Sequence, residues 1–175
     1  DVKLEYWDGK ILSMAGASAN HCTIETNLLG LLWTQLHGSV CSAFGSNQAV
    51  SIPGNAIYVF PYVSVACGGA EHQIHRGIAC LTNPLLLAEI TYPSTEKNDR
   101  LSKLLQYTRI RSAKDYLVVE QDQPVVMHYS RRSWDEVWHV SFFEGLDATI
   151  ELGSVGAWVA LKDLYEGVQL SELPL

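Results

Sequence analysis

Glu89 lies in the middle of an otherwise apolar run, residues 85–91, whose sequence is LLLAEIT. The run is short, rich in aliphatic residues and flanked by Pro84 and Pro93, which is typical of a buried strand. An ionised carboxylate in such a strand is costly unless a cation or strong hydrogen-bond donors lie beside it. The sequence therefore predicts a partner for Glu89. Both an ordinary ion pair with Lys or Arg and a metal-binding or catalytic role account for this residue.

The pattern along the chain predicts a mixed α/β fold. Helices are expected over 21–37 and 97–110, where apolar residues recur every three or four positions. An Asp-Gly turn predicts a hairpin over 5–14. Runs rich in β-branched and aromatic residues predict successive strands of one sheet, over 40–52 with a break at Gly45, 57–67, 85–91, 115–120, 125–129, 137–143 and 149–152. We expect this sheet to be covered by helices on at least one side.

Length and composition indicate one domain, residues 1–175, because a chain of 175 residues with 47% hydrophobic content can bury a single core. The formal charge of −7 argues against strong nonspecific binding of nucleic acid, which depends on Lys and Arg. The longest apolar runs are too short to cross a bilayer, so we expect no membrane association and a cytoplasmic protein. The first residue is Asp1 rather than Met, so residues that precede it are expected to be missing.

The four cysteines do not form a CxxC pair, and their spacing does not indicate a zinc site. A disulfide framework is not expected in a domain of this size. We therefore interpret all of them as reduced cysteines of the core: Cys22, Cys41, Cys67 and Cys80.

Six short motifs along the chain resemble, in order, those of the Uma-two family. They are YWDGK at 6–10, Asn20-His21, YVFPYV at 58–63, AEITYPST at 88–95, DRLSKLLQY at 99–107, and the closing EGLDAT at 144–149 with YEG at 165–167. The likeness covers nearly the whole chain. That family is regarded as a set of restriction-endonuclease-like domains within the PD-(D/E)XK nuclease superfamily. The resemblance implies a mixed β-sheet flanked by helices and Mg²⁺-dependent hydrolysis of phosphodiester bonds in DNA.

In that superfamily, carboxylates on neighbouring strands hold Mg²⁺, which prefers oxygen ligands. The metal polarises the scissile phosphate and lowers the pKa of a bound water, while a lysine orients that water or stabilises charge. The resemblance assigns Glu89 as the strand acid and Glu89 and Ile90 as metal-ligand positions. The usual lysine position holds Thr91, so the lysine is expected from the following helix, at Lys103.

Three further residues complete the predicted site. Asp99 lies four residues before Lys103, so the two share a helix face, although an ordinary i, i+4 salt bridge on a solvated surface explains this pair equally. On a helical wheel Lys103 points nearly opposite the predicted apolar stripe, which consists of Leu101, Leu104, Leu105 and Thr108. His21, at the start of the first helix, matches a family motif. The third residue of the predicted site is Tyr62.

Position 62 departs from the family pattern. The family's Pro-Asp is Pro61-Tyr62 here, so a neutral phenol with a pKa near 10 replaces the second strand carboxylate. Magnesium binding and catalysis are therefore expected to be impaired. The alternative is a catalytically inactive domain of the same fold that binds nucleic acid or protein. Strand alternation predicts that Tyr62 shares a face with Tyr58, Phe60 and Ser64.

Other acids and histidines offer weaker alternatives. Glu25 follows His21 by four residues and is a candidate substitute for the missing aspartate, but a hydrogen bond on the helix surface explains the pair as well. Glu71, His72 and His75 lie in a predicted polar loop over 68–77, where such residues often bind nothing. A homodimer is an expectation from the size and class of the protein.

Overall fold

A six-stranded sheet forms the centre of the fold. The computed structural model describes residues 4–7, 10–13, 18–54, 57–91 and 96–171. The central strands lie in the order β12-β11-β10-β9-β6-β3. They are β3 (Cys41–Gly45), β6 (Val63–Cys67), β9 (Leu86–Thr91), β10 (Asp115–Glu120), β11 (Val125–Ser130) and β12 (His139–Glu144). β9 and β10 are parallel and the other neighbouring pairs are antiparallel, so the sheet is mixed, as predicted.

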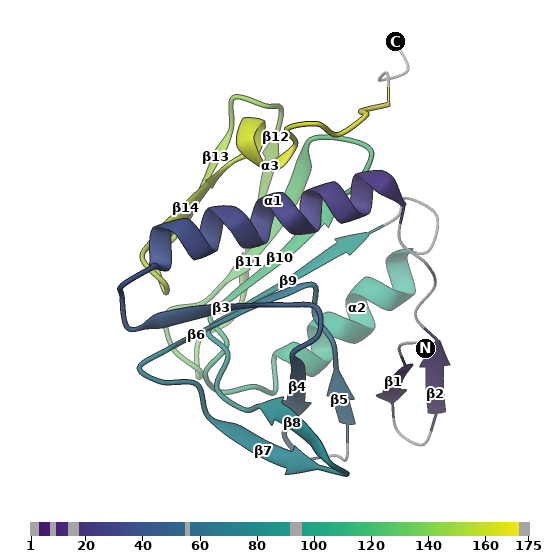
Figure 1. Cartoon of the computed structure of the whole chain (residues 1–175), viewed down its shortest axis with the longest axis vertical. Helices are drawn as coiled ribbons and strands as arrows, with labels where there is room; N and C mark the ends of the chain where they lie inside the picture. Colours follow the sequence, from purple (N-terminus) through teal and green to yellow (C-terminus); the bar gives the residue numbers. More distant parts are fainter. Residues whose placement is uncertain (1–3, 8–9, 14–17, 55–56, 92–95, 172–175) are drawn as a thin grey trace.

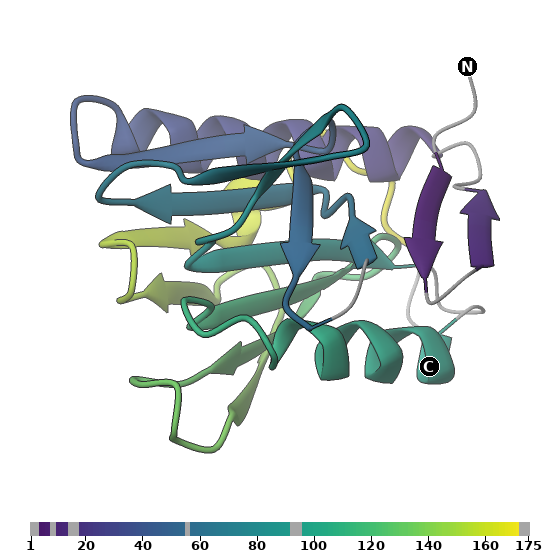
Figure 2. The same cartoon turned by 90° about the horizontal axis from the view of Figure 1, so that it is seen from below.

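Different elements cover the two faces of the central sheet. Helix α1 (Ala19–Leu36) packs on the face that carries Ile90, in a cluster of buried side chains called here the α1 core. Helix α2 (Glu96–Tyr107) packs on the face that carries Leu87, in a second cluster called the α2 core. Figures 1 and 2 show the sheet between the two helices. Because side chains alternate along a strand, Glu89 points to the same face as Leu87.

A second six-stranded sheet borders the α2 core, in the order β2-β1-β5-β4-β8-β7. Its strands are β1 (Leu4–Trp7), β2 (Lys10–Ser13), β4 (Ala49–Ile52), β5 (Ile57–Val59), β7 (His72–His75) and β8 (Ile78–Leu81). The predicted N-terminal hairpin is confirmed as β1 paired with β2. The prediction that all strands belong to one sheet is wrong, because β propensity identifies a strand without specifying its partner.

The prediction of a loop over 68–77 is also wrong. β7 and β8 form an antiparallel hairpin, with Arg76 and Gly77 as the two turn residues. Both have positive φ, 50° and 84°, as a two-residue hairpin turn of type I′ requires. β7 is largely exposed and carries mostly polar side chains, so it lacks the alternating apolar pattern by which strands are recognised.

The C-terminal part packs on α1 (Figure 1). β13 (Thr149–Leu152) is predicted correctly, and it pairs with an unpredicted strand, β14 (Ala157–Ala160), which runs directly into the short helix α3 (Leu161–Leu164). The side chain of Asn27 on α1 donates to the main-chain carbonyls of Leu164 and Glu166, at 3.0 and 2.9 Å. These bonds fix the end of α3 against the helix.

Both long helices are predicted to within about three residues at each end. α1 begins after Ser18, whose hydroxyl oxygen accepts a hydrogen bond from the main-chain N–H of His21 at 3.2 Å. This is an N-cap, and it satisfies one of the free N–H groups at the start of the helix.

Among the described helices, none combines the length and apolar character that a membrane span would need.

The interpretation of all four cysteines as reduced core residues is wrong for three of them. Cys41 and Cys67 form a disulfide, and Cys22 is exposed, whereas Cys80 is free and buried as expected. Cys41 and Cys67 are directly opposite each other in the antiparallel pairing of β3 with β6. Only that pairing brings them together, because 26 residues separate them in sequence.

The disulfide closes a loop of moderate length and should stabilise the fold mainly by restricting the unfolded chain. For such a loop the contribution is about 3 kcal/mol. Urea denaturation of the Cys41→Ser/Cys67→Ser variant should therefore show a free energy of unfolding lower by about that amount. The Cys22→Ser variant is the control and should match the wild type. Equal stability of the double variant and the wild type would contradict the prediction.

Candidate active site

Glu89 is buried at the centre of the molecule, with 2% of its surface exposed. On β9 it stands beside Val118 of the parallel neighbour β10. Its Oε1 atom lies 3.1 Å from Nζ of Lys103 and accepts a hydrogen bond of 2.5 Å from the hydroxyl of Tyr107. The expectation that this carboxylate needs a partner is therefore confirmed, and the partners are a cation and a charge-assisted donor.

Lys103 and Tyr107 reach Glu89 because they are four residues apart on α2 and share one face of the helix. Tyr107 is fully buried, and the Lys103 side chain is 13% exposed. The predicted apolar stripe of α2 is wrong in part, because Leu105 is 57% exposed while Leu104 packs against the α2 core. The helix thus turns a lysine and a tyrosine inward, where the buried carboxylate of Glu89 compensates the lysine charge.

Sequence reasoning did not single out Tyr107 as a site residue, although its i+4 spacing from Lys103 was a usable signal. Its ring makes an edge contact with Tyr116 of β10 at 5.0 Å between centroids, and Tyr116 stacks on Tyr129 of β11 at 5.7 Å. This row of rings fixes the position of the Tyr107 hydroxyl against Glu89.

Arg131 holds the end of α2 in place. Its guanidinium donates to the main-chain carbonyls of Ile110 and Ala113 at 2.6 and 2.8 Å, and it stacks over the ring of Trp138 at 4.5 Å. Burial lowers the pKa of Arg131. The segment that follows Tyr107 is thereby tied to β11.

Tyr62 lies between strands β5 and β6, in neither of them. Its main-chain N–H donates to the carbonyl of Ala88 at 3.1 Å, so its backbone is adjacent to Glu89. Its ring packs against the α1 core and makes an edge contact with the ring of His21 at 4.2 Å. The prediction that Tyr62 shares a face with Ser64 is wrong, because strand alternation does not extend through this bend.

His21 is buried in the first turn of α1, with 1% of its surface exposed. Burial lowers the pKa of its imidazole, the nearby Glu25 carboxylate opposes this, and the Lys103 ammonium lowers the pKa further. The main-chain bond of Tyr62 to Ala88 links the His21–Tyr62 pair to β9, the strand that carries Glu89.

The remaining predicted residues contribute less. Asp99 is on α2, but its side chain lies outside the described residues. Ile90 is buried and apolar, so only its main-chain carbonyl has a donor atom for a metal.

Within the described part of the chain, no group of three His, Cys, Asp or Glu side chains is arranged to hold a metal. His72 instead contacts Gln48 at 3.3 Å, and His75 packs on the ring of Tyr58.

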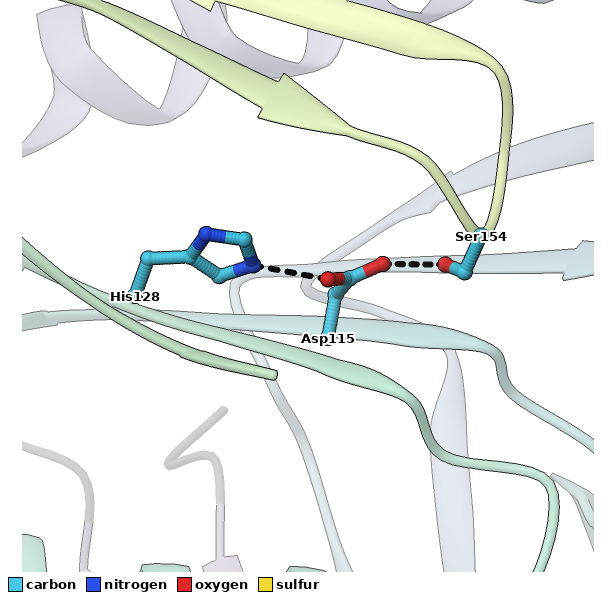
Figure 3. A network of polar contacts seen from close by, with 3 residues as sticks. All are labelled: Asp115, His128 and Ser154. Atoms are coloured by element: carbon cyan, nitrogen blue, oxygen red, sulfur yellow. Dashed lines mark hydrogen bonds and ion pairs between the residues drawn. The ribbon is translucent and has the colours of Figure 1, made fainter. Parts of the chain in front are cut away.

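A second polar cluster lies at the opposite end of β10, at Asp115. Figure 3 shows that Nε2 of His128 bonds to Oδ1 of Asp115, at 2.7 Å, and that the hydroxyl of Ser154 donates to Oδ2. Asp115 and His128 are 4% and 7% exposed. The three residues line a cavity of about 840 Å³ together with Lys114 and Arg132 among others.

This cluster does not have the geometry of a hydrolytic triad. In a triad the serine donates to the imidazole and the carboxylate binds the other ring nitrogen. Here serine and histidine both bind the carboxylate, so the proton of Ser154 is directed to Asp115 and its oxygen is not activated. The network instead fastens the turn between β13 and β14 to the central sheet.

Removal of the Lys103 ammonium should destabilise the protein, because a buried carboxylate loses the cation that compensates it. For Lys103→Met we expect a free energy of unfolding lower by about 3 kcal/mol. The double variant Glu89→Gln/Lys103→Met should lose clearly less free energy of unfolding than the two single variants together. In the double variant the buried carboxylate charge is removed along with the ammonium, so no uncompensated charge remains. Urea denaturation of all four proteins measures this coupling, and additive losses would show that the pair does not interact.

The lowered pKa of His21 predicts a dependence of stability on pH. In the unfolded chain its imidazole titrates near 6.5, whereas burial lowers this pKa in the folded state. Below pH 6.5 the unfolded chain therefore binds this proton more tightly than the folded protein does, and stability falls. From pH 7.5 to pH 5 the wild type should lose more free energy of unfolding than His21→Phe. Parallel curves for the two proteins would refute the assignment.

The chain resembles known proteins over most of its length. It matches the model of the Uma2 family, described as "Putative restriction endonuclease", over residues 1–162. It is 31% identical to the uncharacterized protein slr1290 of Synechocystis sp. over 95% of this chain and 85% of the relative. It is also 31% identical to the uncharacterized protein sll1609 of the same organism, over 85% of this chain and 83% of the relative.

A solved structure supports the fold. The crystal structure of a "putative nuclease belonging to DUF820" from Anabaena variabilis superimposes with a TM-score of 0.74, covering 93% of this chain and 89% of that one at 17% identity. At this identity the likeness concerns the fold, and it agrees with the restriction-endonuclease-like α/β architecture that the motifs implied. The match to the family model over residues 1–162 shows that the chain belongs to the Uma2 family.

Proposed function

We propose that this protein is a nuclease whose site around Glu89 serves Mg²⁺-dependent hydrolysis of DNA phosphodiesters, with metal binding weakened by Tyr62. The observation that carries the proposal is the pairing of the buried Glu89 with Lys103 at 3.1 Å. The superfamily's chemistry uses a strand carboxylate and a lysine, and here the lysine arrives from α2 rather than from β9. The family membership supports the same reaction class.

The donor atoms fit Mg²⁺ only at the lower limit. Protein sites for this ion commonly use one or two carboxylates together with substrate phosphates. Glu89 would supply the one carboxylate, and the main-chain carbonyl of Ile90 is the second predicted ligand. A bound divalent cation would supply charge to polarise the scissile phosphate and favour deprotonation of the attacking water.

The residues of the chain have separate roles in this proposal. Tyr107 keeps its hydrogen bond to Glu89 and so holds the carboxylate in a fixed orientation. Lys103 carries a positive charge that can orient the attacking water or stabilise charge that develops on the phosphate. His21 packs on Tyr62, and burial lowers the pKa of its imidazole, which favours the neutral form.

The second candidate function is a noncatalytic domain that binds nucleic acid or protein through the same surface. The observation that favours it is Tyr62, whose ring packs on His21 and has no carboxylate to offer a metal. With a net charge of −7, any affinity for DNA would be modest and sensitive to salt.

Nicking of supercoiled plasmid in the presence of Mg²⁺ or Mn²⁺ tests the nuclease proposal. We expect slow nicking by the wild type and a loss of at least tenfold in Glu89→Gln. Glu151→Gln, which changes an exposed carboxylate on β13, is the matched control and should nick at the wild-type rate. Salt-sensitive binding of DNA without nicking would favour the noncatalytic domain instead.

The role of position 62 has its own test. Tyr62→Asp restores the family's carboxylate beside Ala88, and it should increase the affinity for Mn²⁺ measured by calorimetry. Glu151→Asp, which shortens an exposed carboxylate on β13, is the control and should leave that affinity unchanged. An unaltered affinity in Tyr62→Asp would exclude position 62 from the metal site.

A further inference from the structure

β12 is an edge strand with exposed apolar side chains. It is the last strand of the central sheet and pairs only with β11 in the described sheet order. In Figure 2 the light-green segment that contains β12 lies at the lower left margin of the molecule. Five exposed large apolar residues occur on this strand and on the segments that flank it, at Trp134 (50%), Val137 (73%), Val140 (47%), Phe142 (68%) and Leu146 (43%).

Exposed edges are normally protected against pairing. Natural proteins place Lys, Pro or a bulge there, because the unpaired N–H and C=O groups can bind another strand. β12 has the sequence HVSFFE, with neither Lys nor Pro. β7, which is an edge strand of the second sheet, is mostly polar, and Ile74 is its one large apolar residue. The other edge of the central sheet, β3, also lacks Lys and Pro, but four of its five residues are only partly exposed. Of these three edges, β12 itself carries the most exposed large apolar residues.

We propose that β12 pairs antiparallel with β12 of a second copy of this chain, so that two central sheets join across a two-fold axis. A two-fold axis perpendicular to the sheet keeps equivalent faces on the same side, so paired residues must share a face. The register centred on Ser141 satisfies this condition over the whole of 139–143. It places Val140 opposite Phe142 of the partner, twice, and such aliphatic–aromatic pairs stabilise antiparallel strands.

The charges of the strand also favour a second copy. β12 begins with His139 and ends with Glu144. Antiparallel pairing places the two Glu144 carboxylates at opposite ends of the joined strands, whereas a parallel arrangement would bring these like charges side by side. Isologous contacts of this kind are the usual way in which identical chains form closed dimers.

The apolar surface continues from β12 onto β11. In the register between these strands, Val140 is beside Tyr129 and Phe142 is beside Met127. Tyr129 and Met127 pack against the α2 core, so this is also the face on which Glu89 lies. In the dimer both Glu89 residues would therefore lie on the same side of the joined sheet. Cleavage of both DNA strands by one dimer would follow only if the proposed nuclease function holds. The dimer itself does not depend on that function.

Sedimentation velocity at 10 to 100 μM tests the dimer. The wild type should sediment as a dimer, and Phe142→Lys should sediment as a monomer, with at least a tenfold weaker association. Ile74→Lys is the matched control, because Ile74 is 67% exposed on the edge strand β7 and its substitution should leave the dimer intact. A monomeric wild type, or a dimer that only Ile74→Lys disrupts, would overturn the proposal.

Cross-linking tests the register independently of the effect of Phe142→Lys on folding. In a Cys22→Ser background, Ser141→Cys places two cysteines opposite each other at the two-fold axis. Mild oxidation should convert most of this variant to a covalent dimer on nonreducing gels, whereas Ser42→Cys on the other edge strand, β3, should remain monomeric. No covalent dimer from Ser141→Cys would overturn the register. Loss of plasmid nicking with an intact dimer would bear on the proposed function alone.

Discussion

The ion pair between Glu89 and Lys103 joins the two parts of the structure on which the site depends. Glu89 belongs to a strand that is buried on both faces, and its carboxylate cannot remain charged there without compensation. Lys103 provides that compensation from α2, and Tyr107 adds a hydrogen bond to the same oxygen. The packing of α2 on the central sheet is thus specified by charge as well as by apolar contact. The cost of desolvating both charges offsets much of their attraction, so the net contribution of such a buried pair to stability is small. A packing that separated the two groups would leave a buried charge uncompensated, and the pair therefore favours this position of α2.

The two faces of the sheet divide the predicted site into two pairs. Glu89 and Lys103 belong to the α2 core, whereas Tyr62 and His21 pack beside α1. The two pairs are linked through β9, where the main-chain N–H of Tyr62 bonds to the carbonyl of Ala88, the residue before Glu89. An aspartate at position 62 is too short to pack on His21 as the tyrosine ring does. The substitution therefore changes both the charge of the site and what this segment contacts.

Glu89 inside β9 and Asp115 at the start of β10 have different surroundings, and this separates their roles. Within β9, Glu89 is paired with a lysine that belongs to a helix rather than to the sheet. Asp115 accepts two hydrogen bonds, from a histidine on the adjacent strand and a serine in a tight turn. Its partners are fixed by the sheet, and the network connects the β13–β14 hairpin to the core.

The sequence by itself determined the local structure and the central problem of the site. The helical periodicity of α1, the strands β9 and β10, and the burial of Glu89 all follow from short segments, because periodicity and propensity act over a few residues. The motifs in their order also identified the family. The lysine partner was named from that resemblance, but the helical wheel alone pointed Lys103 away from the core.

Only the tertiary structure decided which segments meet. It paired β4 and β5 with a second sheet, joined Cys41 to Cys67, and turned Lys103 and Tyr107 rather than Leu105 inward. It also placed the ring of Tyr62 on His21, where strand alternation had pointed elsewhere. The physical reason is the same in each case. These contacts join residues distant in sequence, and their free energy depends on charge compensation and packing between elements, which no local pattern contains.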